Sequence, residues 1–362
     1  MLCWQKYEER ITAGMLLRAG PISIAVSTVW LLCEMILLLT CSGAQGQTCP
    51  YVFSTYWPSS DPIWTLAWAT PDQSVGVDGS GLQLTDVRYK GKQVFHMAHL
   101  PVLNVLYELG GCGDTYLSHR DWQTGLRAFE ASNVVSPCQA EPTTAPQTVC
   151  DHPGVDAGSF AGVAVEKKAD QLILTTQMQA GWYRYIQKWF FFRDGTIQAR
   201  FYFTAIEDYC VNKPHYHQAY WRFDFDIEGA ANDVIEEYNS ATDWKAFSVE
   251  TNRKKNPATG RKWRVRNKGT GRGYEMIPDP TDDIADNWAV ADMWALRYHD
   301  AEIDDGGALP GPMGNAAHLN NYLNRESIHG RHDVLWYRVG HRHDSLPVCV
   351  SIGLTLKPVG NW

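Results

Sequence analysis

Three patterns that would each point to a class of protein are missing from this chain of 362 residues. None of its nine cysteines belongs to a Cys-x-x-Cys pair, which argues against a zinc ribbon or a redox-active dithiol. No Asn-x-Ser/Thr sequon is present, so N-glycosylation gives no independent sign of secretion. No long helical period of apolar residues competes with the strand signals, so a helical fold is not expected.

Positive charge is also scarce. The chain has 32 Lys and Arg against 40 Asp and Glu, a formal net charge of −8. Such a balance argues against a general nucleic-acid or anionic-membrane binder. The stretch 251–274 is a local exception, with nine Lys and Arg and no acidic residue. Either a nucleic-acid or heparin patch or a solvated hairpin arm would explain this stretch. The net negative charge of the whole chain favours the hairpin arm.

Aromatic residues are abundant instead, at 12% of the chain with 15 Trp and 17 Tyr. These residues favour strands, and short apolar runs bounded by Gly, Asp or Pro repeat along the chain. The Asp194-Gly195 dipeptide marks a hairpin, and short helical turns are expected only within 101–108 and 313–324. We predict one all-β domain, a large antiparallel β-sandwich, with strands at residues 64–68, 87–94, 171–176, 183–192, 197–205, 220–227, 334–339 and 348–356.

Residues 1–44 have the features of a targeting segment. Residues 22–39 are nearly all apolar, Arg18 precedes them, and Ser42-Gly43-Ala44 gives a small-residue cleavage pattern. We predict a cleaved signal peptide and a secreted domain at 45–362. An uncleaved signal anchor in the secretory pathway is the alternative, and only then would the protein contact a membrane. Glu34 lies inside the apolar run and favours secretion over an anchor.

An even number of cysteines, six, follows the targeting segment, as disulfides in a secreted chain would produce. Cys138 and Cys150 lie in a stretch, 131–158, that is rich in Pro, Ser, Thr and Gly. We predict a surface loop closed by a Cys138–Cys150 disulfide. The partners of the other four stay open: Cys49, Cys112, Cys210 and Cys349.

His215-Tyr216-His217 is the sharpest local signal. Residues i and i+2 of a strand point to the same face, so the two imidazoles can share one metal ion. Nitrogen ligands suit copper or zinc. An isolated pair of this kind also arises by chance, and a third histidine strengthens the interpretation. His341 and His343 form a second pair just before the final predicted strand.

The order of several stretches resembles the catalytic domain of the copper amine oxidases, the enzymes that carry topaquinone. The resemblance runs from about Trp64 to Trp362 and implies the large antiparallel β-sandwich (supersandwich) of that family. The matching stretches are residues 81–89, 94–108, 182–189, 260–267 with 273–274, 333–340 and 353–358.

The resemblance also implies functional residues and an activity. Copper would bind His215, His217 and His343, with His341 as the alternative third ligand, and Tyr183 would be the precursor of topaquinone. Asp121 falls on the catalytic base. The implied reaction converts a primary amine and dioxygen into an aldehyde, hydrogen peroxide and ammonia. A homodimer is common in the family, and a peripheral calcium site would use Asp224, Asp226 and Asp333.

The neighbours of Tyr183 depart from the family pattern. Trp182 and Arg184 stand where the family has an asparagine and a carboxylate. The alternative hypothesis is therefore a divergent relative that binds copper or a small molecule without topaquinone, repurposed in secondary metabolism. A purely structural β domain is the third hypothesis, and it requires the histidines to align by accident.

Overall fold

The computed structural model describes residues 52–76, 80–107, 118–119, 140–141, 148–151, 163–180, 183–205, 209–287, 289–303, 316–345 and 349–362. The predicted targeting segment at 1–44 lies outside these ranges, as do Asp121, Cys138 and Trp182. Within the described ranges, no helix combines the length and the apolar character needed to cross a bilayer.

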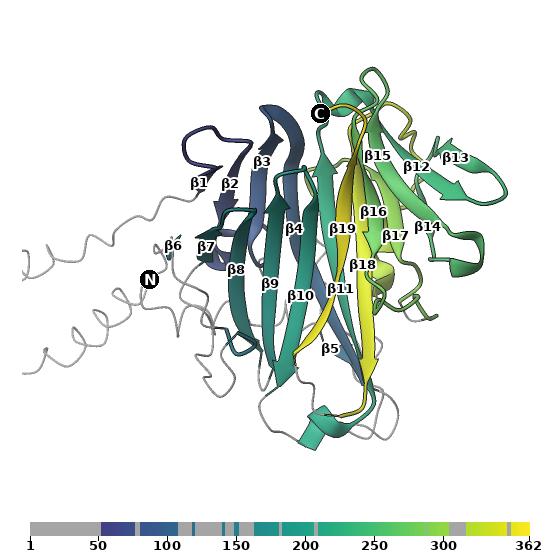
Figure 1. The fold of residues 1–362 in the computed structure, drawn as a ribbon. Coiled ribbons are helices and arrows are strands. Elements are labelled where there is room, and N and C mark those ends of the chain that lie inside the picture. Colours follow the sequence, from purple (N-terminus) through teal and green to yellow (C-terminus); the bar gives the residue numbers. More distant parts are fainter. Residues whose placement is uncertain are drawn as a thin grey trace, which may run out of the picture. The chain divides into compact units, whose positions relative to one another are not determined.

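Two large sheets build the unit from Pro50 to Trp362 (Figure 1). Sheet A contains, in spatial order, β1 (Phe53–Trp57), β2 (Trp64–Ala69), β3 (Gln83–Tyr89), β4 (Lys92–Tyr107), β11 (His215–Phe225), β18 (Asp333–His343), β17 (Met293–Arg297) and β14 (Thr251–Arg253), with β5 (Ser118–His119) also paired to β4. Sheet B contains β13 (Asp243–Ala246), β12 (Asp233–Asn239), β15 (Lys262–Asn267), β16 (Gly273–Pro278), β19 (Val350–Val359), β10 (Ile197–Ala205), β9 (Tyr183–Phe192), β8 (Gln171–Ala180), β7 (Val163–Lys167) and β6 (Ala140–Glu141).

The predicted antiparallel β-sandwich is confirmed. Between described strands, every pairing is antiparallel except the short one of β6 with β7. Helical structure in the described ranges is confined to short 3₁₀ turns: η1 (Pro71–Gln73), η2 (Tyr209–Asn212), η3 (Ala230–Asn232), η4 (Pro257–Thr259) and η5 (Ala316–Tyr322). The last of these lies within the predicted helical turn at 313–324.

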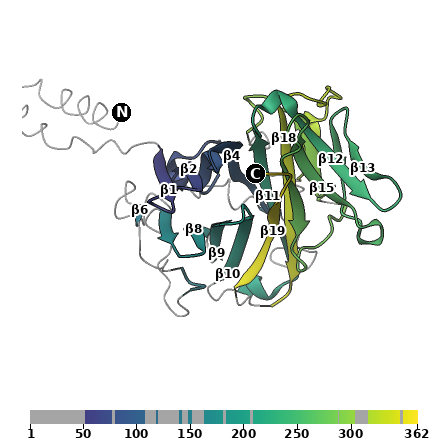
Figure 2. The same cartoon turned by 45° about the horizontal axis from the view of Figure 1, so that its top comes forward.

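Several of the abundant tryptophans lie in the core between the sheets. Strands β8, β9 and β10 form a layer that is separate from β2 and β4 (Figure 2). Trp189 of β9 meets Trp221 of β11 edge to face, with ring centroids 5.0 Å apart, and both side chains are fully buried. Burying such large apolar surfaces is the main favourable contribution to folding, and the rings hold the two sheets at a fixed spacing.

The hairpin predicted from Asp194-Gly195 is confirmed, with β9 and β10 at the predicted bounds. Gly195 has φ of 91°, and a Cβ atom there would lie 2.7 Å from the ring of Tyr89. Glycine is therefore required at this turn both for its backbone conformation and for its small size.

Two local predictions were wrong. The run 87–94 is not one strand, because Lys90 and Gly91 both have positive φ and form the turn that joins β3 to β4. Residues 101–107 are not helical but continue β4, which pairs with β11 along its length. Pairing with a strand distant in sequence decides their conformation there, and local sequence cannot report it.

The predicted Cys138–Cys150 disulfide is also wrong, because Cys150 bonds to Cys349 instead. Residues 148–151 lie against sheet B, where Val149 N donates to Gln177 Oε1 (2.9 Å) and Asp151 pairs with Lys188 (2.8 Å). This contact places Cys150 beside the start of β19, with its Cα 5.6 Å from that of Cys349. The link therefore joins segments 199 positions apart rather than closing a small ring.

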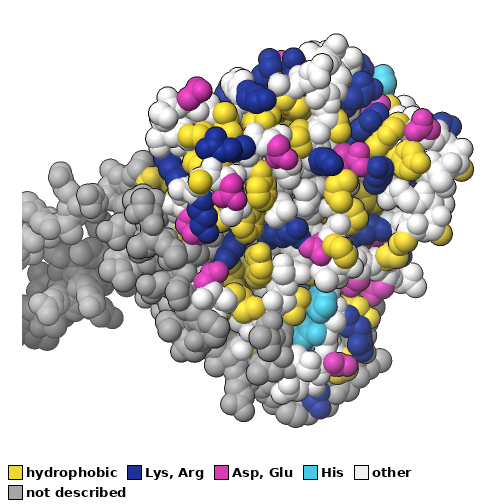
Figure 3. Space-filling view, in the orientation of Figure 1, with side chains coloured by type: hydrophobic (Ala, Val, Ile, Leu, Met, Phe, Trp, Pro, Cys, Tyr) yellow, Lys and Arg dark blue, Asp and Glu magenta, His cyan; other side chains and the backbone are white. Residues whose placement is uncertain are grey.

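The basic stretch 251–274 is balanced by acidic residues from outside it. Glu236 pairs with Arg264 and Arg266, at 2.6 and 2.9 Å, and Lys262 pairs with Glu275 at 2.6 Å. Lys and Arg side chains alternate with Asp and Glu over the face seen in Figure 3 and form no continuous basic patch there. The local charge is thus largely used in cross-strand pairs.

Candidate metal centre

Three strands bring the candidate site together between the two sheets. Strand β9 of sheet B carries Tyr183 and Tyr185, while β11 and β18 of sheet A carry the histidines. His215 lies directly opposite His343 in the β11–β18 ladder. Because side chains alternate along a strand, His217 shares the inner face with His215.

His215, His217 and His343 converge, with one ring nitrogen of each lying within 4.8 Å of the others. His215 and His217 are fully buried, and His343 is 8% exposed. Over the described ranges, no other group of three His, Cys, Asp or Glu side chains is gathered in this way. His341, the alternative third ligand, is cross-strand neighbour to His217 and half-buried at the margin of the cluster.

Hydrogen bonds to backbone carbonyls fix which ring nitrogen carries the proton in two of the three histidines. Nδ1 of His343 donates to the carbonyl oxygen of Ser345 (2.9 Å), and Nδ1 of His215 donates to that of Lys213. A carbonyl only accepts, so these Nδ1 atoms carry the protons and the Nε2 atoms of the same two rings are unprotonated. Nε2 of His217 and Nε2 of His343 are buried without a hydrogen-bond partner.

Two of the three histidines, His217 and His343, are neutral at ordinary pH. Burial, together with the neighbouring His215, lowers the pKa of His343 to about 4. Burial also lowers the pKa of His217 well below its usual value, with added contributions from His215 and His343. Metal ions bind the neutral form of imidazole, so the environment keeps the ligands ready for a cation.

Tyr183 lies at the edge of this cluster, where its hydroxyl is 2.5 Å from His215 Nε2. Its ring is buried and stacks on that of Tyr185, with centroids 5.5 Å apart and planes 7° from parallel. Tyr185 in turn places its hydroxyl 3.4 Å from Nδ1 of His217. The two tyrosines of the Tyr183-Arg184-Tyr185 stretch thus each meet one histidine of the pair in β11.

Arg184 does not face the cluster. Its buried side chain lies on the other face of β9, where it donates to the backbone oxygen of Tyr183 (2.9 Å). The positive charge of Arg184, which stands where the family has a carboxylate, therefore lies on the outer side of sheet B and not beside the histidines. Phe203 of β10 is a site residue that the sequence prediction missed; it stacks on His217 at 4.1 Å. The alternation of aromatic residues in β10 marks an inward face but does not reveal what that face contacts.

The structure does not gather the three predicted calcium ligands. Asp224 is buried and bonds to His332 Nε2 (2.7 Å), whereas Asp226 turns back to accept the amide of Gly229 (3.0 Å). Asp333 lies at the start of β18, and burial, with nearby Asp233 and Glu250, raises its pKa to about 9. Burial and the carboxylates of Asp226 and Asp224 likewise raise the pKa of Asp233 to about 8.

Comparison with known proteins gives the class to which this site belongs. The family model described as "Copper amine oxidase, enzyme domain" matches residues 156–360, more than half of the chain. The chain therefore belongs to the copper amine oxidase family. None of the curated proteins matches it.

Several solved structures share the fold at low sequence identity. Lysyl oxidase of Pichia pastoris has a TM-score of 0.57 at 16% identity, over 82% of this chain and 52% of that one. The copper-containing benzylamine oxidase of Hansenula polymorpha has 0.57 at 15%, over 82% and 59%. The amine oxidase of Aspergillus nidulans has 0.57 at 15%, over 95% and 55%. The chain thus spans about half the length of these proteins.

Proposed function

We propose that this chain is a copper-dependent oxidase of primary amines, in which His215, His217 and His343 hold the metal and Tyr183 is the precursor of topaquinone. One observation carries the proposal: the Tyr183 hydroxyl lies 2.5 Å from Nε2 of a histidine that belongs to a buried cluster of three. Family membership supports the same chemistry, and the similar solved structures include a copper-containing benzylamine oxidase and an amine oxidase.

The donor set fits copper. Imidazole nitrogens suit that ion, and the Nε2 atoms of His217 and His343 are buried acceptors without a partner, an unfavourable state that a cation would relieve. Carbonyl oxygens of Lys213 and Ser345 hold two of the rings in the orientation that directs Nε2 inward. Such outer contacts fix ligand geometry and strengthen binding.

The chain's own residues would do the rest of the work. When bound, copper and dioxygen supply the oxidation that turns a tyrosine ring into a quinone able to accept electrons from an amine. Tyr185 and Phe203 wall the Tyr183 ring and exclude water from it. Asp121, assigned by resemblance alone, would remove the proton from the substrate carbon. The net reaction takes amine, dioxygen and water to aldehyde, ammonia and hydrogen peroxide.

We further propose that the domain is secreted, with residues 1–44 as its signal. This proposal rests on the apolar run at 22–39 and the small residues that follow it. The amino-terminal sequence of the protein recovered from culture medium tests it. A mature chain that starts near residue 45 supports the proposal, and a chain retained in the membrane fraction overturns it.

One observation favours the second candidate, a copper-binding relative without the quinone. The Tyr183 ring is packed against Tyr185, His217 and Phe203, with centroids 5.5, 4.7 and 6.4 Å away, and it is 1% exposed. Conversion to topaquinone must add oxygen to ring carbons, and so close a packing favours an unmodified tyrosine.

The mass of the tryptic peptide that contains Tyr183, measured after aerobic loading with Cu(II), separates the two candidates. Conversion adds oxygen and removes hydrogen from the ring, and phenylhydrazine then labels the peptide. An unchanged peptide mass from protein that has bound copper would exclude the quinone and leave the second candidate. Anaerobic loading is the matched control, because the conversion needs dioxygen.

A further inference from the structure

The outer face of β11 and β18 carries a second polar cluster directly behind the histidines. Side chains alternate along both strands, so Gln218, the residue after His217, points to the opposite, outer face. Gln218 lies opposite Gly340, and Tyr220 lies opposite Arg338, in the same ladder that sets His215 against His343. Whatever fixes this ladder therefore also fixes the distance between the histidines of β11 and His343.

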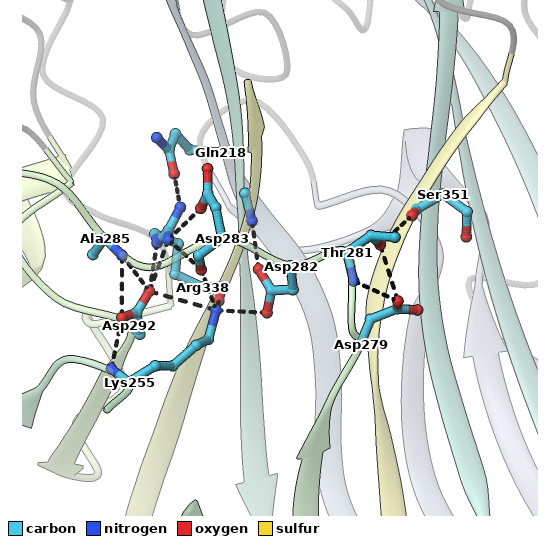
Figure 4. A network of polar contacts seen from close by, with 11 residues as sticks. Gln218, Lys255, Asp279, Thr281, Asp282, Asp283, Ala285, Asp292, Arg338 and Ser351 are labelled. Atoms are coloured by element: carbon cyan, nitrogen blue, oxygen red, sulfur yellow. Dashed lines mark hydrogen bonds and ion pairs between the residues drawn. The ribbon is translucent and has the colours of Figure 1, made fainter. Parts of the chain in front are cut away.

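Arg338 is the centre of the outer cluster (Figure 4). Its fully buried guanidinium donates to Gln218 Oε1 in β11, to Asp283 Oδ1 (2.6 Å) and to Asp292 Oδ1 (2.9 Å from Nε). One rigid, planar group thus spans from β11, across its own strand, to the segment 282–292. Arginine is suited to this because its five donors lie in one fixed fork.

Gly340 shows how closely the chain is fitted around this group. A Cβ atom at position 340 would lie 2.8 Å from Gln218 Oε1, 2.6 Å from Asp283 Oδ1 and closer still to the Arg338 guanidinium. The Gly340 amide also donates to Asp282 Oδ1 (2.9 Å), and its carbonyl accepts from the Asp283 amide (3.1 Å). Both backbone polar groups of Gly340, the residue before His341, are therefore bonded to the segment 282–283.

Cations and carboxylates lie next to one another in the cluster around Arg338. Lys255 Nζ lies 2.5 Å from Asp282 and 3.5 Å from Asp292, so two buried cations face two fully buried carboxylates and the partly exposed Asp283. Burial lowers the pKa of Arg338, but Asp292 and Asp283 outweigh it and leave the pKa above its usual value. A buried ion network with every member bonded has one geometry, and this rigidity is its main contribution.

We propose that Arg338 is a positioning residue for the three-histidine cluster: by joining Gln218 of β11 to Asp283 and Asp292 across β18, it holds His217 and His343 at ligand distance. The inference rests on the proposed copper site for its consequence, but its geometry does not depend on the metal. A strand advances about 3.3 Å per residue, so even a small shift of β18 along β11 would separate the ligands.

Two variants and one control test the role in the full-length protein. Arg338→Lys keeps the charge but loses the fork to Gln218, while Gln218→Met removes only the acceptor and leaves the pairs of Arg338 with Asp283 and Asp292. Glu236→Gln is the control, because it breaks a comparable network, with Arg264 and Arg266, in sheet B and away from the histidines. Cu(II) affinity by competition titration and the electron paramagnetic resonance spectrum of the Cu(II)-loaded protein are measured for each.

Arg338→Lys is expected to weaken Cu(II) binding by about tenfold, the lower end for outer contacts of metal ligands, and to change the spectrum. Gln218→Met should give a smaller change in the same direction, and Glu236→Gln should match the wild type in both. Wild-type affinity and spectrum in both Arg338→Lys and Gln218→Met would overturn the proposal. The proposal would also be overturned if Glu236→Gln changed the Cu(II) affinity and the spectrum as strongly as Arg338→Lys does.

Hydrogen–deuterium exchange of the metal-free protein separates this inference from the proposed function. Amides of residues 215–218 and 340–343 should exchange faster in Arg338→Lys and Gln218→Met, whereas Glu236→Gln should affect only β12 and β15. If the wild type binds no copper, the proposed function fails while the exchange pattern still decides the positioning role. Unchanged exchange at 215–218 and 340–343 in both variants refutes that role.

Discussion

The two faces of β11 and β18 carry buried polar clusters built in opposite ways. On the outer face, Arg338 and Asp292 are charged and bonded by several partners each. On the inner face, burial keeps His217 and His343 neutral, and the Nε2 atom of each has no hydrogen-bond partner. A saturated cluster can hold strands in place but bind nothing more, whereas an unsaturated one keeps the capacity to bind.

Removing a carboxylate from the outer cluster should have the largest effect on stability. Asp292 is fully buried and accepts from Arg338, from the Lys255 amide (2.8 Å) and from the Ala285 amide (2.9 Å). Asp292→Ala leaves a buried guanidinium short of its counter-charge, and we expect the free energy of unfolding to fall by about 3–5 kcal/mol. Urea denaturation at pH 7 measures the change.

Glu326→Ala is the matched control for that substitution. Glu326 pairs with His299 at 2.6 Å, but both side chains are 41% exposed. Exposed pairs contribute at most about 1 kcal/mol, so the control should stay close to wild type. Equal losses in the two variants would show that burial does not set the importance of the outer cluster.

The inner cluster should make the metal-free protein sensitive to acid. The pKa of His343 is lowered to about 4 in the folded chain, below an ordinary value of 6.5. The unfolded state therefore binds the proton first, and the stability contributed by this group is lost as the pH falls from about 6.5 to about 4. The full loss is about 3 kcal/mol.

Urea denaturation of metal-free wild type and His343→Gln between pH 7 and pH 4 measures that loss. The difference between the two proteins should shrink or reverse toward pH 4, since glutamine takes up no proton. A wild-type curve that runs parallel to that of His343→Gln over this range would contradict the lowered pKa.

Copper should stabilise the folded protein through the inner cluster alone. At a free Cu(II) concentration of one hundred times Kd, the gain is about 2.7 kcal/mol, seen as a higher melting temperature. His217→Ala removes one ligand and should abolish the gain. His332→Ala, which removes a histidine bonded to Asp224 on the other face, should keep it. A retained gain in His217→Ala would place the copper elsewhere.

Replacing the Tyr183 hydroxyl should have the smallest effect on stability and a complete effect on the quinone. Tyr183→Phe loses the hydrogen bond to His215 and should change the free energy of unfolding by about 1 kcal/mol. Redox-cycling stain after aerobic Cu(II) loading should disappear. Tyr185→Phe is the control and should keep the stain. Loss of the stain in Tyr185→Phe as well would show that Tyr183 is not the only tyrosine needed for the quinone.

The sequence predicted the candidate site better than it predicted the connections around it. His215 and His217 lie two apart on one strand, and a period of two is visible in any sequence. His343 was singled out as the third ligand through the resemblance. By contrast, Arg338 and Gln218 are 120 residues apart, and the sequence pattern near either residue does not predict that the two are in contact.

The failed predictions have the same physical origin. Residues 101–107 are strand because β11 pairs with them, and Cys150 meets Cys349 because residues 148–151 lie on sheet B near the start of β19. Both outcomes depend on contacts between segments far apart in the chain. Where the deciding interaction is local, as in the hairpin at Gly195, the prediction was confirmed to the residue.

The Cys150–Cys349 bond has a consequence for a cleaved chain. Tyr183, His215, His217 and His343 all lie between the two cysteines, inside the covalent ring that the bond closes. A single protease cut anywhere in that ring leaves one connected molecule that still carries all four side chains. On a gel, such a nicked protein runs as one species without reductant and as two fragments with it, so integrity of the site and integrity of the backbone are separate properties of this protein.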